Sequence, residues 1–213
     1  MTQYDISVAY SAGTPEWPGD TPYSCGWAWD MAKGASVNVG HVTTSWHVGT
    51  HADAPLHVIA NGAASETMPL EAFSGPCTVI DARDASVGPV LTIEWLSTAL
   101  EGRPIPARLL IRTGLSTGSG IFPAGWPSLT PDAAAWLTTA GMRLFGVDAP
   151  SVDPKTATDL VVHKTLFTGG AWFLENLSLN AVPDGDYHLT AHPVLVVGAD
   201  AAPVRAVLES LDR

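Results

Sequence analysis

Apolar residues occur along the chain in short runs that glycine, proline, asparagine and aspartate interrupt. Runs of this length and composition are typical of β-strands with turns between them. We therefore expect strands in eight segments: residues 4–10, 37–48, 77–82, 108–114, 143–149, 171–177, 187–197 and 203–211.

Three segments between these runs carry apolar residues at helical spacing instead: residues 92–102, 130–141 and 152–170. Thr92 and Thr130 stand where they can cap the first two helices, and glycines follow all three. Strands that alternate with helices predict a mixed α/β fold, in one domain over residues 1–213.

The composition narrows the possible functions. Hydrophobic residues make up 46% of the 213 residues, enough for a core, whereas the formal net charge is −11. Such a charge opposes binding to nucleic acid and to anionic membrane surfaces. We expect no nucleic-acid or membrane partner, and a small-molecule substrate instead.

Location and assembly follow from simpler features. The first ten residues show no cationic region before an apolar run, and no stretch is long enough to span a membrane, so we predict a cytoplasmic protein. Few charges, eight tryptophans and seventeen prolines predict a surface buried in a homodimer or higher homo-oligomer. The two cysteines, Cys25 and Cys77, are expected to be buried free thiols.

Residues 47–57, HVGTHADAPLH, hold three of the seven histidines and an aspartate. Glycine and proline within this segment oppose a regular helix, so a strand that runs into a tight turn is expected. His51 and Asp53 then point the same way, and a bend at Gly49 brings His47 round to them. Two imidazoles and one carboxylate suit zinc or manganese and leave positions open for water or substrate.

Other candidate residues carry less local signal. From chemistry alone, His163 reads as an exposed helix histidine and Glu175 as a charge at the rim of a strand. Asp148 either shapes a pocket or makes a turn. The remaining histidines are expected to be satisfied structural residues: His41, His188 and His192.

The pattern H-x-G-T-H-x-D-x-P-x-H resembles the signature of the cyclase-like metal-dependent hydrolases. Further segments resemble the formamidase branch of that family in the same order: EWPGDTP (16–22), SVNVGHVTTS (36–45), GVDAPSVDP (146–154), FLENLSL (173–179), VPDGDY (182–187) and APVRAVLESL (202–211). The resemblance covers essentially the whole chain and implies the family's swivelling β/β/α fold.

The resemblance also implies roles for single residues. His47, His51 and Asp53 would bind one metal ion, and Asp53 would reach a second ion held by His163 and bridged by Glu175. His57 would be the general acid/base rather than a ligand. Trp17 would contact the substrate, although a packing role suits a tryptophan equally well.

The implied activity is hydrolysis of N-formyl-L-kynurenine to L-kynurenine and formate, with two zinc ions per subunit or with manganese. Asn176 departs from the formamidase branch, in which glycine often follows the glutamate. Two alternatives therefore stay open: a cyclic-amide hydrolase of the isatin hydrolase type, and a metal-binding protein of the same family without catalysis.

Overall fold

The computed structural model describes residues 2–84 and 90–211. Nine strands form one mixed sheet in the order β1-β13-β11-β5-β7-β9-β10-β4-β12. Two smaller pairs, β2 with β3 and β6 with β8, complete the described strands. In chain order the strands are β1 (Gln3–Asp5), β2 (Ser24–Trp29), β3 (Val39–Thr43), β4 (His51–Asp53), β5 (Ser74–Asp81), β6 (Val90–Leu91), β7 (Arg108–Arg112), β8 (Ser128–Leu129), β9 (Leu144–Val147), β10 (Trp172–Glu175), β11 (Gly185–Thr190), β12 (Ala201–Pro203) and β13 (Val207–Ser210).

The centre of the large sheet is parallel, from β5 through β7 and β9 to β10, and the flanking strands are antiparallel. All residues of β7 and β9 are buried, as expected for strands that are covered on both faces. The predicted mixed α/β class is confirmed. Several strands end earlier than predicted: β1 stops at Asp5 and β11 at Thr190, because their later residues leave the sheet.

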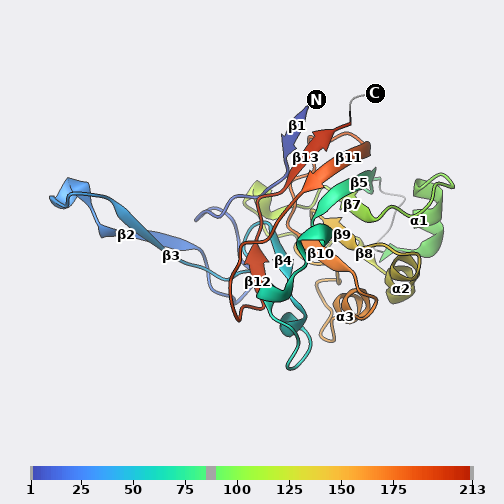
Figure 1. Cartoon of the computed structure of the whole chain (residues 1–213), viewed down its shortest axis with the longest axis horizontal. Helices are drawn as coiled ribbons and strands as arrows, with labels where there is room; N and C mark the ends of the chain where they lie inside the picture. Colours follow the sequence, from blue (N-terminus) through green and yellow to red (C-terminus); the bar gives the residue numbers. More distant parts are fainter. Residues whose placement is uncertain (1, 85–89, 212–213) are drawn as a thin grey trace.

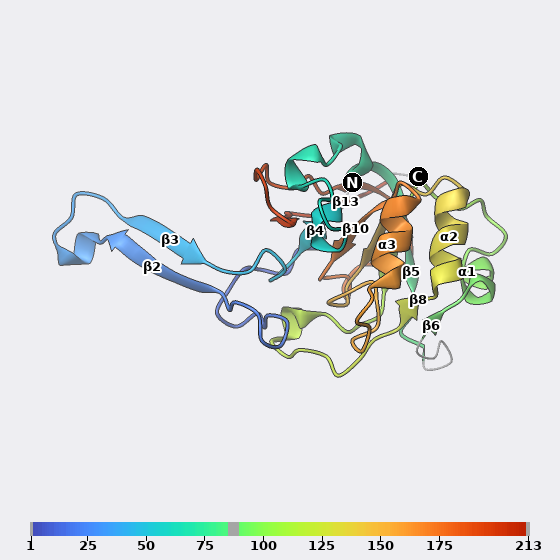
Figure 2. The same cartoon turned by 90° about the horizontal axis from the view of Figure 1, so that it is seen from below.

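Three α-helices, α1 (Ile93–Ala99), α2 (Pro131–Thr139) and α3 (Val161–Thr168), cover one face of the sheet (Figure 2). The Thr92 and Thr130 side chains accept hydrogen bonds from the first turns of α1 and α2, which confirms both predicted caps. Within the described part of the chain, no helix has the length and apolar character needed to cross a membrane.

The predicted start of the third helix is wrong. Helix α3 begins at Val161 rather than near Val152, and Leu160 before it has a left-handed backbone (φ 47°). The Asp153 carboxylate accepts hydrogen bonds from the backbone N–H groups of Val162 and His163, so residues 153–160 form a loop that folds back on the helix. This return loop places His163 in the first turn.

Two apolar cores lie on the two faces of the sheet. Residues of α1, α2 and α3 pack on one face around Leu109, Phe145 and Phe173. The other core contains Leu110, Leu174 and residues of β5, β11 and β13. Adjacent residues of one strand thus face opposite cores, and the backbone of β9 and β10 is held between them.

Strands β2 and β3, with the 3₁₀ turn η1 (Met31–Lys33) between them, form a hairpin that projects from the rest of the molecule (Figure 1). Every residue of both strands is exposed except the half-buried Gly26. Cys25 lies on this hairpin and is exposed, so the prediction that it is buried is wrong. Cys77 is buried, as predicted.

Candidate metal centre

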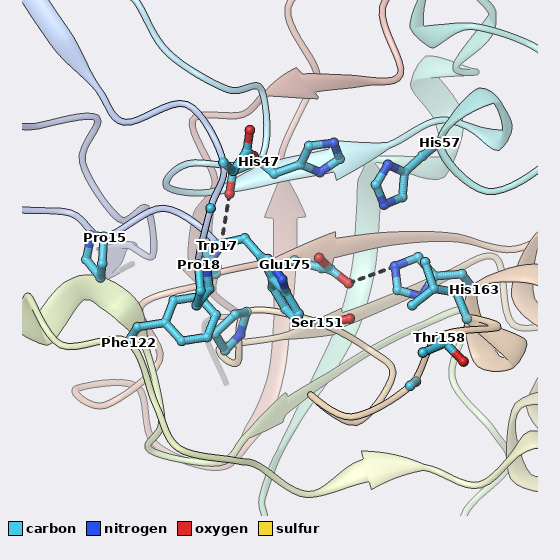
Figure 3. A pocket seen from close by; sticks show the side chains of 16 residues that line it. Pro15, Trp17, Pro18, His47, His57, Phe122, Ser151, Thr158, His163 and Glu175 are labelled. Atoms are coloured by element: carbon cyan, nitrogen blue, oxygen red, sulfur yellow. Dashed lines mark hydrogen bonds and ion pairs between the residues drawn. The ribbon is translucent and has the colours of Figure 1, made fainter.

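Neighbouring strands bring together residues from distant parts of the sequence. Strand β4 pairs antiparallel with β10, and His51 lies directly opposite Glu175. Glu175 ends β10 at the carboxyl edge of the parallel strands, where α/β proteins commonly place their sites. The first turn of α3 contributes His163 at the same edge, and its ring faces Glu175 (Figure 3).

The bend predicted before His51 is present. Gly49 has a left-handed backbone (φ 66°), and a Cβ atom there would lie 2.9 Å from the Val8 carbonyl oxygen. Only glycine fits this turn without strain. The turn returns His47 to the cluster, with its Nδ1 3.1 Å from Asp53 Oδ1.

Two buried carboxylates form the centre of the cluster. Asp53 Oδ1 lies 3.3 Å from His51 Nε2, and Asp53 Oδ2 lies 3.4 Å from His163 Nε2. Glu175 approaches the same two nitrogens, at 3.5 Å and 3.4 Å. The side chains of Asp53, His51, Glu175 and His163 are each at most 4% exposed. His163 and Glu175 are therefore neither an exposed helix histidine nor a rim charge.

The outer nitrogen of each imidazole faces an acceptor. His51 Nδ1 lies 2.9 Å from the Gly49 carbonyl oxygen, and His163 Nδ1 lies 2.5 Å from Asp153 Oδ2. His47 Nε2 lies 3.0 Å from Asp200 Oδ2. Because these oxygens only accept, each neutral ring carries its proton on the outer nitrogen. Its inner nitrogen then presents a lone pair to the carboxylates.

Three lone pairs and two carboxylates facing one another require positive charge between them. Neither oxygen of Asp53 accepts a hydrogen bond of normal geometry from any residue that the structure describes, although both are buried. Orphaned buried carboxylate oxygens beside imidazole nitrogens match the donor set of a divalent cation. The residues present thus fit a metal centre.

The pKa values reflect the same demand for positive charge. Burial lowers the pKa of His51, but the contacts with Asp53 and Glu175 outweigh burial and raise it to about 9. For His163, burial is likewise outweighed by Asp153 and Asp53, and the pKa rises to about 10. With pKa values this high, the inner nitrogens of His51 and His163 hold protons near pH 7 in the metal-free protein.

Two overlapping groups of donors share Asp53: His47, Asp53 and His57 in one, and His51, Asp53 and Glu175 in the other. His57 lies in the 3₁₀ turn η2 (Pro55–His57) and is half-buried. Its Nε2 is 3.9 Å from Asp53 Oδ2, farther than the inner nitrogens of the other three histidines, and its Nδ1 is 3.5 Å from Asp200 Oδ2. The ring stands at the edge of the donor set.

A pocket of about 510 Å³ opens above the cluster. His47, His57, His163, Glu175 and Trp17 all line the pocket (Figure 3). Trp17 packs edge-on against Phe122 and Trp126, with ring centroids 5.4 Å and 6.0 Å away, and is 37% exposed. The tryptophan is thus both packed and open to a ligand.

Two residues of the site escaped the sequence analysis. Asp153 and Asp200 orient His163 and His47. Asp153 lies within the segment GVDAPSVDP, but nothing in that segment points to His163, and Asp200 is far from the histidine motif in the chain. Asp148 lies outside the cluster: it is buried and accepts hydrogen bonds from the backbone N–H groups of Thr113 and Gly114. His41 and His192 are exposed and lie outside the cluster. His188 Nδ1 is buried without a hydrogen-bond partner among the described residues, so the prediction of a satisfied histidine is wrong for His188.

Comparison with known proteins places this chain in a family. The profile of the Putative cyclase family matches residues 4–154. The kynurenine formamidase of Bordetella avium is 42% identical over 208 residues, which cover 98% of each protein. The chain belongs to the Putative cyclase family.

Solved structures agree with this assignment. A potential metal-dependent hydrolase with cyclase activity superposes with a TM-score of 0.82 at 29% identity, covering 97% of this chain and 96% of the other. Isatin hydrolase A from Labrenzia aggregata, bound to benzyl benzoate, gives a TM-score of 0.81 at 25% identity, with 97% and 93% covered. Together with the donor set, these similarities indicate a metal-dependent hydrolase fold.

Replacing Gly49 by alanine should displace His47 and weaken metal binding. The left-handed backbone costs about 1–2 kcal/mol for a residue with a Cβ atom, and contact with the Val8 carbonyl adds to that cost. The measurement is zinc affinity by competition with a chromophoric chelator. Gly34→Ala is the matched control, because Gly34 is also left-handed but has open space around it; equal zinc affinity in the two variants would contradict the role of the turn.

Metal binding should release protons. Because the pKa values of His51 and His163 are raised to about 9 and about 10, the metal-free protein holds these protons near pH 7, and an incoming ion must displace them. Apparent zinc affinity should therefore rise with pH up to those values. Calorimetry in two buffers of different ionisation enthalpy measures the release; binding without proton release would contradict the assigned protonation.

Proposed function

We propose that this protein is a metal-dependent amidohydrolase that cleaves N-formyl-L-kynurenine to L-kynurenine and formate. The observation that carries the chemistry is the set of inward imidazole nitrogens of His47, His51 and His163 around two buried carboxylates. The substrate is supported by the identity of 42% to a kynurenine formamidase over 98% of both chains. The pocket has a volume suited to a small molecule.

For the metal we propose two zinc ions per subunit, with manganese as the alternative. His47, His51 and Asp53 would hold one ion, and His163 with Glu175 would hold the second, which Asp53 also reaches. The shared position of Asp53 between these nitrogens supports a bridging role. The Glu175 carboxylate, which also accepts a hydrogen bond from the Val152 backbone at 2.8 Å, is fixed in the same way between His51 and His163.

Bound metal ions supply Lewis acidity, which lowers the pKa of a water molecule and polarises the amide carbonyl. The protein's own part is to move a proton. His57, close to the donor set and open to the pocket, accepts a proton from the attacking water and delivers it to the departing nitrogen. The C–N bond breaks, the water oxygen remains on the formyl carbon as formate, and the nitrogen leaves as a neutral aniline.

The aromatic wall of the pocket fits an aryl substrate. Trp17 is held edge-on by Phe122 and Trp126, so little conformational entropy is lost when a ring stacks beside it. We propose that Trp17 contacts the aniline ring of the substrate. Trp17 would then hold the aryl end of the substrate, and the cluster of histidines and carboxylates would hold its formyl end.

A cyclic-amide hydrolase of the isatin type is the second candidate. The similarity to isatin hydrolase A over 97% of this chain favours it, because water activated by a metal ion can attack a ring amide as well as a linear one. Asn176, buried directly after Glu175 and lining the pocket, separates this chain from the expected formamidase pattern.

Three broader features complete the proposal. Residues 1–213 act as one domain, and the chain forms a homodimer or higher homo-oligomer. The apolar exposed residues support self-association. A cytoplasmic location stays a prediction from the sequence.

The proposed reaction is tested with protein that is stripped by a chelator and then reconstituted. Formate release from N-formyl-L-kynurenine should be absent without metal and restored by zinc, with manganese and isatin assayed in parallel. Turnover of isatin alone would replace the formamidase assignment by the second candidate. Zinc binding without turnover of either compound would favour a metal-binding protein that lacks catalysis.

Replacing His57 by alanine should lower kcat by roughly a hundredfold or more while zinc content stays unchanged, because the proton relay is lost but the ligands remain. The His57→Gln variant should behave alike, since glutamine keeps a polar side chain that cannot carry the proton. Zinc content and kcat are measured on the same samples. Loss of zinc together with activity would make His57 a ligand instead.

A further inference from the structure

The ring of His57 lies between two carboxylates that differ in their surroundings. Its Nδ1 is 3.5 Å from Asp200 Oδ2, and its Nε2 is 3.9 Å from Asp53 Oδ2. Asp53 is completely buried and belongs to both groups of metal donors, whereas the Asp200 side chain is 41% exposed and belongs to neither. One nitrogen of the ring therefore faces the metal centre, and the other faces a carboxylate outside it.

A single oxygen of Asp200 is shared by two imidazoles. Asp200 Oδ2 lies 3.0 Å from His47 Nε2 as well as 3.5 Å from His57 Nδ1. The two rings are close neighbours, with centroids 4.2 Å apart. An aspartate is normally ionised at neutral pH and then only accepts hydrogen bonds, so a favourable contact requires a proton on each of these two nitrogens.

The backbone fixes the position of Asp200 relative to His57. The Ala54 N–H group donates to the Asp200 carbonyl oxygen at 2.8 Å, and the Ala54 carbonyl oxygen accepts from the His57 N–H group at 2.9 Å. Ala201, which follows Asp200, begins β12 and pairs with Asp53 of β4. Asp200 is therefore attached to the edge of the sheet, next to the turn that carries His57.

We propose that Asp200 is a positioning residue for the reaction: it holds the proton of the neutral His57 ring on Nδ1 and so leaves the lone pair of Nε2 directed at the metal centre. This inference rests on the proposed function, in which His57 moves the proton. Asp200 does not line the pocket that the described residues form, so it acts through the ring and not on the substrate.

The tautomer of His57 decides which way the proton can move. With Nδ1–H held by Asp200, Nε2 is free to accept a proton from the attacking water. The ring then carries a positive charge, which the Asp200 carboxylate stabilises without taking the proton itself. Nε2 next delivers that proton to the departing nitrogen, and the ring becomes neutral again. In the other tautomer the lone pair would point at Asp200, away from the water.

The contact of Asp200 with His47 suggests a different role, which the test has to separate. An acceptor at the outer nitrogen of a metal ligand orients that ligand, and its loss commonly lowers metal affinity. Asp153 contacts His163 in this way, at 2.5 Å, but makes no hydrogen bond or ion pair with His57 in the described part of the chain. Comparison of the two aspartates therefore distinguishes an effect on a metal ligand from an effect on His57.

Nitrogen-15 NMR of the zinc-loaded full-length protein tests the tautomer directly. Histidine-selective labelling gives signals from seven residues, and the signals of His57 are those that disappear in the His57→Ala variant. In a buffer alkaline enough for a neutral ring, Nδ1 of the wild-type protein should show the chemical shift of a protonated nitrogen and Nε2 that of an unprotonated one. A proton on Nε2 would overturn the proposal.

The Asp200→Ala variant should lose this preference, so that both nitrogens of His57 show intermediate chemical shifts. Asp153→Ala is the matched control, because it removes the corresponding acceptor from His163 and should leave the His57 signals unchanged. Zinc content and circular dichroism check that both variants are loaded and folded. Unchanged His57 signals in Asp200→Ala, or equal changes in both variants, would contradict the proposal. If Asp200→Ala does not fold, the wild-type spectrum alone decides.

Kinetics at saturating zinc give a second test. Asp200→Ala should lower kcat for formate release by roughly ten- to a hundredfold, with KM nearly unchanged. In the His57→Ala background the same substitution should change kcat by less than about twofold, because its effect passes through the ring. An equal loss in both backgrounds would overturn the proposal and restrict Asp200 to the metal centre. Absence of formate release from the wild-type protein would instead refute the proposed function, whereas the NMR measurement requires no substrate.

Discussion

The mutual approach of Asp53 and Glu175 to three imidazoles is the constraint around which the carboxyl edge of the sheet is arranged. Two carboxylates removed from water are costly unless positive charge lies between them, and the inner nitrogens offer lone pairs rather than protons when the rings are neutral. The outer acceptors hold the rings in this orientation: the Gly49 carbonyl, Asp153 and Asp200. The pairing of β4 with β10 and the first turn of α3 position these histidines and carboxylates. The same contacts therefore determine the fold at this edge and its distribution of charge.

Local sequence patterns predicted most helices and strands, because residues within a few positions determine where these elements begin and end. Threonine caps, glycine stops and apolar runs act within a few residues, and α1, α2 and the central strands form where those signals stand. Residues 153–160 and 191–197 were misassigned for a different reason. Their apolar content matches that of a helix and of a strand. However, the Asp153 carboxylate accepts a hydrogen bond from the backbone at the start of α3, which makes residues 153–160 a loop. The second segment follows β11 and is largely exposed.

The candidate site divides in the same way. The bend at Gly49 and the common direction of His51 and Asp53 follow from backbone rules within seven residues, and the structure has both. His163 and Glu175 carry no signal of their own, and only the resemblance to a family pointed to them before the structure brought them to Asp53. Asp200 reaches His47 across most of the chain. Residues so far apart in the chain form no spacing pattern that a single sequence can reveal.

The position of β4 has a consequence for the order of assembly. This strand lies between β10 and β12, both of which come from the last quarter of the chain, although β4 itself belongs to the first. During synthesis, His51 of β4 therefore stays without its strand partners until residues 172–175 and 201–203 have left the ribosome. Metal binding to the complete donor set would then occur late in folding. A metal-loaded centre would show that β4 has already paired with β10.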